Sequence, residues 1–273
     1  MMNFVKLYNK EFMKERKSFV VTLVLLFLAE AFLYSRIGHW PTGIPTFISG
    51  MIAFGVGIGA FFNSFDYMGD EWKRSNHYLM LSLPVRGWDI FGAKLAWLMT
   101  EFGTHLLLLG AYSAVILLGE ARAAEVLTAQ LYQGVMAMTW RVYGIMIIPM
   151  LYTLASMGIL ALFAYTVSRT VKQLSFLAKA VGYIVPLWLF SYLAQKVMAV
   201  SPSWMHIEMP LVDALALDQL KRGLESSGIV NVDLWGLENA VLGIDMASVV
   251  IWAAGMVAIF IFGSWLLENR VEA

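Results

Sequence analysis

The stretch MASVVIWAAGMVAIFIFGSWLL, residues 246–267, is almost wholly apolar and contains no charged side chain. A helix needs roughly 20 mostly apolar residues to cross about 30 Å of hydrocarbon, so this stretch is long enough to span a bilayer. Five further stretches meet the same test, and we therefore expect six transmembrane helices. The predicted spans are residues 18–35, 44–65, 95–119, 142–167, 174–200 and 246–267.

The composition also indicates a membrane protein. Of the 273 residues, 60% are hydrophobic and 14% are charged, whereas an average soluble protein is about 25% charged. The spans lack the alternation over about ten residues that a membrane barrel requires, and no linker suggests a second domain. We therefore expect residues 1–273 to form a single all-α transmembrane domain.

Charge and residue types exclude several functions. The formal net charge is +0, so bulk electrostatics gives no indication of a nucleic-acid partner. The chain has no cysteine, which excludes disulfides, thiolate nucleophiles and cysteine metal sites. The four histidines are far apart, and the Gly-x-Ser-x-Gly and His-Glu-x-x-His motifs are absent. We therefore predict no catalytic residue and no metal site.

Lysine and arginine placement predicts the orientation, because these residues resist translocation. They concentrate before the first span, in the connections after the second and fourth spans, and in the tail. Both termini and the connection 66–94 are therefore expected in the cytoplasm, and the loop 201–245 outside. The residues assigned to the cytoplasmic side are Lys6, Lys10, Lys14, Arg16, Lys17, Lys73, Arg74, Arg86, Lys94, Arg169, Lys172, Lys179 and Arg270.

The segment before the first span has apolar residues at helical spacing, with lysines at the other positions. This pattern predicts an amphipathic helix on the inner membrane surface; the alternative is a basic flank that only sets topology. Residues 29–31 read Ala-Glu-Ala and match a signal-peptide cleavage pattern, but five further spans favour an uncleaved helix. The apolar residues are Phe4, Leu7, Tyr8, Phe12 and Met13.

The outer loop 201–245 contains leucines at helical spacing with charged residues between them, which predicts a helix lying on the outer surface or capping the bundle. Its acidic residues are typical of a solvated face, with attraction of a cationic ligand as the alternative. The leucines are Leu211, Leu215, Leu217, Leu220 and Leu224.

The connection 66–94 carries a near match to a phosphate-binding loop, in residues 87–94, GWDIFGAK. The match fails because Ala93 displaces Lys94 by one place and Leu95 replaces the hydroxyl that binds magnesium. No β-strand is predicted before it either. If this chain takes part in an ATP-driven process, a partner protein must therefore bind the ATP.

The predicted spans contain two carboxylates, Glu30 and Glu101, and a pair of glycines four residues apart. Glu101 lies four residues before His105, so both are on one helix face, where they are placed to share a proton or to form a structural pair. Glu30 is placed to meet Arg36 or the aqueous boundary. Gly55 and Gly59 form a small-xxx-small pair, which predicts a close helix contact.

The connection also carries Glu71, residues 81–85 (LSLPV), Ile90 and Lys94, which leads into the third span. With six spans, an amphipathic start and a large outer loop, this combination resembles the permease subunits of ABC-2 type transporters, which are mostly bacterial exporters. Residues 86–87 (Arg-Gly) and Ala93 depart from the pattern common in the family.

The resemblance implies a permease that pairs with a second copy or a related permease and with two cytosolic ABC ATPases, which bind ATP and magnesium. It would sit in the bacterial cytoplasmic membrane and export, or extract from the membrane, an amphipathic or hydrophobic substrate such as a peptide, lipid or drug. The connection would form a coupling helix on the ATPase, ending at Pro84. Its docking residues would be Glu71, Lys73, Arg74, Tyr78, Leu81, Leu83 and Pro84.

Two other functions stay open at this point. A proton-coupled secondary transporter would use Glu101 and His105. A non-transporting immunity or sensor subunit would use the connection only to recruit a partner.

Overall fold

The computed structural model describes residues 2–73, 86–123, 129–171, 174–210, 218, 221–222 and 241–269. Five of the predicted spans lie within helices, and the span 174–200 exceeds its helix by one residue at the start and two at the end. All 6 helices are long and apolar enough to cross a membrane. The chain is therefore a multi-pass helical membrane protein. The helices are α1 (Met2–Ser35), α2 (Ile44–Lys73), α4 (Gly87–Ala123), α5 (Ala129–Thr170), α6 (Ser175–Met198) and α9 (Met246–Asn269).

Several helices are longer than the predicted spans. The 37 residues of α4 extend about 55 Å at 1.5 Å per residue, which exceeds a hydrocarbon core of about 30 Å. The connection expected at 66–94 is correspondingly shorter, because α2 continues to Lys73 and α4 begins at Gly87. Polar residues continue a helix readily once it has left the hydrocarbon, so apolar runs underestimate helix length.

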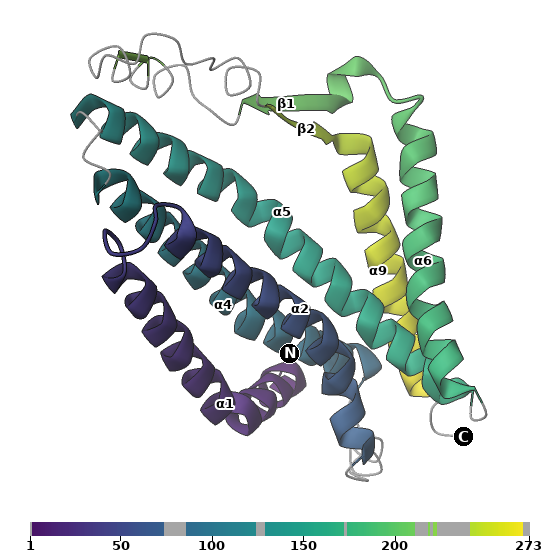
Figure 1. Ribbon diagram of the computed structural model, residues 1–273. Helices are drawn as coiled ribbons and strands as arrows, with labels where there is room; N and C mark the ends of the chain where they lie inside the picture. The colour runs from purple at the N-terminus through teal and green to yellow at the C-terminus, as the bar shows by residue number, and fades with distance from the viewer. Residues whose placement is uncertain are drawn as a thin grey trace.

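The amphipathic segment and the first span form one helix, α1, which bends near its beginning (Figure 1). Part of its apolar side packs on α4: the rings of Tyr8 and Phe12 lie 6.3 and 5.7 Å from that of Trp97. The Tyr8 hydroxyl donates to Thr100 Oγ1 at 3.0 Å. Met13, by contrast, is exposed. The segment is therefore helical as expected, but much of its apolar side contacts the bundle.

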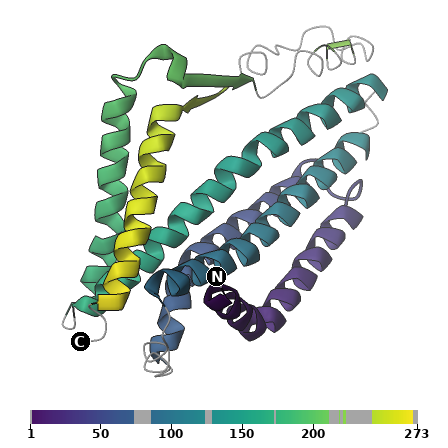
Figure 2. The same cartoon turned by 180° about the vertical axis from the view of Figure 1, so that it is seen from behind.

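The helices form two groups joined by α5. Helices α1, α2 and α4 lie on one side, and α6 and α9 lie together on the other (Figures 1 and 2). Helix α5 contacts α2, α4, α6 and α9, and α4 also contacts α9. One core gathers residues such as Phe91, Leu162 and Leu267, and a second gathers Trp97 and Leu154. The start of α1 and the end of α9 lie opposite the strands.

The ends of the loop 201–245 pair as two strands, which corrects the all-helical expectation. Strand β1 (His206–Pro210) pairs antiparallel with β2 (Val241–Asp245), in a register that sets Ile207 opposite Ile244 and His206 opposite Asp245. Ile207 and Met209 lie on one side of β1, in agreement with the two-residue period of a strand. This alternation covers too few residues to predict a strand from the sequence. A 3₁₀ turn, Ser203–Met205, precedes β1. The predicted leucine stripe lies outside the described residues.

Candidate functional site: the frame of the 74–85 connection and the buried polar groups

Lys94 joins three helices beside the connection. It lies in α4 and its side chain is 2% exposed. Its Nζ is 3.1 Å from Glu11 Oε1 in α1 and donates at 2.8 Å to the carbonyl oxygen of Tyr67 in α2. A buried ammonium is tolerated only with such partners, because its desolvation costs several kcal/mol. The beginning of α1, the end of α2 and the beginning of α4 are thereby held together.

Gly87 fastens the first turn of α4 to the end of α9. Its backbone N–H donates to Glu268 Oε1 at 2.5 Å. A Cβ at this position would collide with the Ser264 carbonyl oxygen and press on the Glu268 side chain. Gly87 is one of the residues that depart from the ABC-2 permease pattern that the sequence resembles. The close approach of α4 and α9 accounts for this glycine.

In the sequence, the predicted docking residues lie between Tyr67, which binds Lys94, and Gly87. Arg74, Tyr78, Leu81, Leu83 and Pro84 fall outside the described residues. Residues 71 and 73 belong to the last turn of α2, where only the backbone is described.

The sequence singled out Lys94 but not its partner Glu11, nor Glu268 as the partner of Gly87. Each pair is far apart along the chain, so periodicity carries no signal for it.

Glu101 and His105 are both buried, at 8% and 1% exposure, but they form no hydrogen bond with each other. Within the described chain, Glu101 Oε2 and both imidazole nitrogens have no hydrogen-bond partner. The imidazole packs against the rings of Phe19 and Phe102, with centroids 5.2 and 6.1 Å apart. The Phe19 backbone approaches it without hydrogen-bonding geometry. The expected proton-sharing pair is therefore not formed.

Glu30 has a different partner from the one expected. The Ser49 hydroxyl lies 3.0 and 2.9 Å from its two carboxylate oxygens and 2.6 Å from the Ser113 hydroxyl. Arg36 instead lies over the ring of Phe32, 4.7 Å from its centroid. The prediction of a Glu30–Arg36 contact is therefore wrong, because Glu30 is buried between helices, at 2% exposure, and is bound by Ser49.

Glu120 is a further buried carboxylate that the sequence analysis missed. It accepts hydrogen bonds from the Gly43 N–H at 3.0 Å and the Thr46 hydroxyl at 2.5 Å. It therefore links the C-terminal end of α4 to the first turn of α2, where free backbone N–H groups favour a negative charge. Glu120 directly follows the predicted span 95–119, so the sequence did not distinguish it from the charged residues that usually flank a membrane span.

Gly55 and Gly59 do not pack against another helix of the described chain. A Cβ at either position would have nothing within 4 Å, and the same holds for Gly50 and Gly57. The predicted close helix contact is therefore not made among the residues that the structure describes. Gly55 and Gly59 are four residues apart and lie on one face of α2; this face, which we call the glycine face, is open.

An apolar cavity of about 720 Å³ lies among α2, α4 and α5. Thr153 is the only hydroxyl-bearing residue that lines it, and this hydroxyl donates to the Pro149 carbonyl at 2.9 Å. The cavity therefore offers almost no free hydrogen-bonding group. Its lining includes Phe54, Ile58, Phe61, Leu106, Met150 and Met157.

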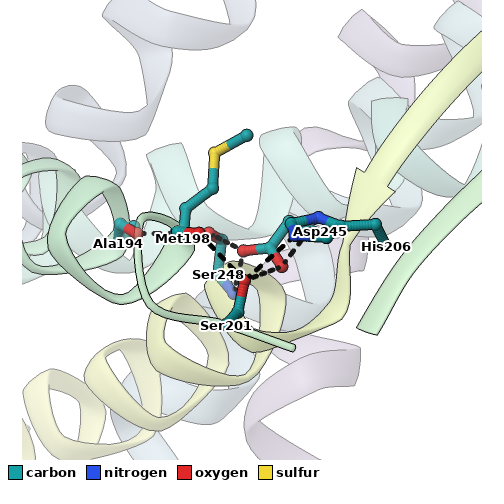
Figure 3. Close-up of polar contacts among 6 residues, drawn as sticks. All are labelled: Ala194, Met198, Ser201, His206, Asp245 and Ser248. Atoms are coloured by element: carbon teal, nitrogen blue, oxygen red, sulfur yellow. Dashed lines mark hydrogen bonds and ion pairs between the residues drawn. The ribbon is translucent and has the colours of Figure 1, made fainter. Parts of the chain in front are cut away.

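At the other end of the bundle, Asp245 caps the first turn of α9 (Figure 3). Its Oδ2 accepts from the Ser248 N–H at 2.9 Å and from the Ser248 hydroxyl, a typical N-cap arrangement. Its Oδ1 lies 3.3 Å from Ser201 Oγ and 3.5 Å from His206 Nδ1. The Ser248 hydroxyl, above all, lowers the pKa of the Asp245 carboxyl below 3.8; partial burial opposes this, while the Ser248 N–H, Ser201 and His206 reinforce it.

Ser201, His206 and Asp245 invite comparison with a catalytic triad, since Ser201 Oγ is also 3.2 Å from His206 Nε2. The geometry excludes it. The two ring nitrogens point in diverging directions, so partners aligned with both cannot lie 3.3 Å from each other, as the serine and the carboxylate do. The group instead joins α6 to α9, because Ser201 and Ser248 also donate to the carbonyls of Met198 and Ala194.

Over the described part of the chain, no group of three or more His, Cys, Asp or Glu side chains is placed to hold a metal ion. The sequence matches no protein-family model, no curated protein and no solved structure.

Proposed function

We propose that this chain is the membrane-spanning permease subunit of an ABC transporter that exports, or extracts from the membrane, an amphipathic or hydrophobic substrate. ATP and magnesium are bound by two separate cytosolic ATPases, and a second permease, identical or related, completes the assembly. The chain itself carries no catalytic residue. It sits in the bacterial cytoplasmic membrane with both termini in the cytoplasm.

The observation that carries the proposal is the frame around the connection 74–85. On its near side the Tyr67 carbonyl is tied to Lys94 and through it to Glu11, and on its far side Gly87 is seated on α9. Close-packed helices shift as rigid bodies. A displacement imposed on the connection by an ATPase would therefore pass to α1, α2, α4 and α9 together.

Two further features support the substrate class and the assembly. The 720 Å³ cavity falls within the roughly 300–1,000 Å³ typical of ligand pockets, and its apolar lining suits a hydrocarbon or aromatic group. The open glycine face of α2 suits close approach of a helix from a second permease, since small residues let two backbones come together in a membrane.

The test is co-expression and reconstitution with separately encoded ABC ATPases. We expect the two proteins to co-purify, and the complex to be lost when Glu71, Arg74 and Tyr78 are replaced together by alanine. Lys196→Ala, at an exposed position at the outer end of α6, is the matched control and should leave the complex intact. Transport by the purified chain with no ATPase present would refute the proposal.

A further inference from the structure

A second, polar cavity of about 210 Å³ lies among α1, α2 and α4. Three carboxylates line it, together with a hydroxyl, an amide and a tyrosine, and no described lysine, arginine or histidine does. The lining residues are Glu15, Ser18, Asn63, Asp66, Tyr67 and Glu101.

The cavity has an exposed rim and a buried floor. Ser18, Asn63 and Asp66 are exposed, whereas Tyr67 and Glu101 are each 8% exposed. On the floor, Glu101 Oε2 has no hydrogen-bond partner in the described chain. A buried carboxylate without a partner is costly, so this oxygen has an unmet requirement for a hydrogen-bond donor, and a charged donor would satisfy it best.

The neighbouring cations are paired with groups other than Glu101. Lys94 binds Glu11 and the Tyr67 carbonyl. Lys14 lies 3.2 Å from Glu15, and the His105 imidazole is enclosed by Phe19 and Phe102. None of these side chains lines the cavity.

The polar lining ends toward the strand end of the bundle. The next layer between α1 and α4 is apolar, formed by residues such as Leu23, Leu26, Phe27 and Leu109, and Leu109 is 0% exposed. Tyr112 also lines this layer, and none of the residues that line the polar cavity lines it. The polar cavity is therefore separate from this largely apolar layer.

We propose that this pocket binds the ammonium group of an organic amine, with Glu101 as its buried counter-ion and Glu15 and Asp66 attracting it at the rim. An ammonium carries three donors, which match the Glu101 carboxylate, the Ser18 hydroxyl and the Asn63 amide oxygen. A metal is disfavoured because no three acidic or histidine side chains of the described residues converge as ligands. This site goes beyond the proposed function and does not depend on an ATPase.

Calorimetric titration of the full chain in nanodiscs of phosphatidylcholine tests the proposal, with empty nanodiscs subtracted. Octylammonium chloride is the probe and octanol is the uncharged control with the same tail. We expect saturable binding of octylammonium only, weakened at least about tenfold by Glu101→Gln, because a hydrogen bond between charged groups is lost. Glu30→Gln is the matched control: it changes another buried carboxylate outside the pocket, and binding should be retained.

Two rim variants, Glu15→Gln and Asp66→Asn, keep the test decisive if Glu101→Gln does not fold. Each should weaken octylammonium binding severalfold, since each removes one attracting charge. Equal affinities of these variants and the unmodified protein, or equal binding of octanol, would overturn the proposal. Displacement of the probe by an equal concentration of sodium or potassium chloride would also overturn it, by identifying an inorganic-ion site.

Discussion

At the scale of single residues, the buried charges divide by how their hydrogen-bonding needs are met. Lys94 has Glu11 and a backbone carbonyl, and Glu30 has the Ser49 hydroxyl. Glu11 Oε2 and Glu101 Oε2 both have no partner in the described chain, but only Glu11 has an ion pair through its other oxygen. A buried charge without a partner raises the free energy of the folded state. The paired groups are satisfied within the protein, whereas the proposed amine would supply the missing partner of Glu101.

Replacing Lys94 by Met should destabilise the protein by about 3–5 kcal/mol, because Glu11 is left as an uncompensated buried charge. Adding Glu11→Gln to Lys94→Met should recover much of that loss. Thermal unfolding in detergent, followed by circular dichroism, gives the four unfolding temperatures of the double-mutant cycle. Additive effects of the two substitutions would show that the pair is not coupled.

The Asp245 cap is expected to make the first turn of α9 sensitive to acid. Its pKa is lowered in the folded protein from 3.8, so its stabilising contribution is complete above pH 3.8 and is lost as the pH falls through the lower folded value. Hydrogen exchange at the Ser248 amide should therefore be faster in Asp245→Asn than in the unmodified protein at pH 6. After correction for intrinsic exchange rates, the difference should shrink below pH 3.8. A difference that persists unchanged at acid pH would contradict this assignment.

At the scale of elements, helix ends are fixed by contacts that lie outside the apolar runs. Helix α4 begins at Gly87, where its backbone meets α9, and α1 continues through the segment that packs on Trp97. The hydrophobic pattern located the middle of each helix, but packing and hydrogen bonding at the ends set its length.

Gly87→Ala should lower the free energy of unfolding by about 1–3 kcal/mol, because its methyl group would force the α4 and α9 backbones apart. Gly92→Ala is the matched control. Its Cβ would meet Phe4 at an ordinary distance of 3.4 Å, so we expect little change. Unfolding temperatures of the two variants in detergent compare them directly, and equal values would contradict the close approach at Gly87.

At the scale of the whole molecule, α5 joins the group α1, α2 and α4 to the pair α6 and α9. The glycine face of α2 is left uncovered by either group. In a membrane, such a face suits helix association more than lipid contact. The proposed pairing with a second copy would give Gly55 and Gly59 a role in assembly.

Gly55→Leu should abolish permease pairing while leaving the monomer folded, because the side chain extends into space that is open in the single chain. Gly144→Leu, at an equally open glycine of α5, should leave pairing unchanged. Since the chain has no cysteine, Gly55→Cys also allows disulfide cross-linking in membranes without background. Pairing of Gly55→Leu at the unmodified level, with no Gly55→Cys cross-link, would exclude this face.

The sequence by itself determined the helical membrane class and the approximate position of all six spans, because about 20 apolar residues in succession have few other stable environments. It also identified Lys94, Glu30 and Glu101 as unusual. Only the tertiary structure decided their partners: Glu11 for Lys94, Ser49 for Glu30, and a polar pocket for Glu101. Hydropathy depends on neighbouring residues along the chain, whereas these pairings depend on how separate helices approach one another.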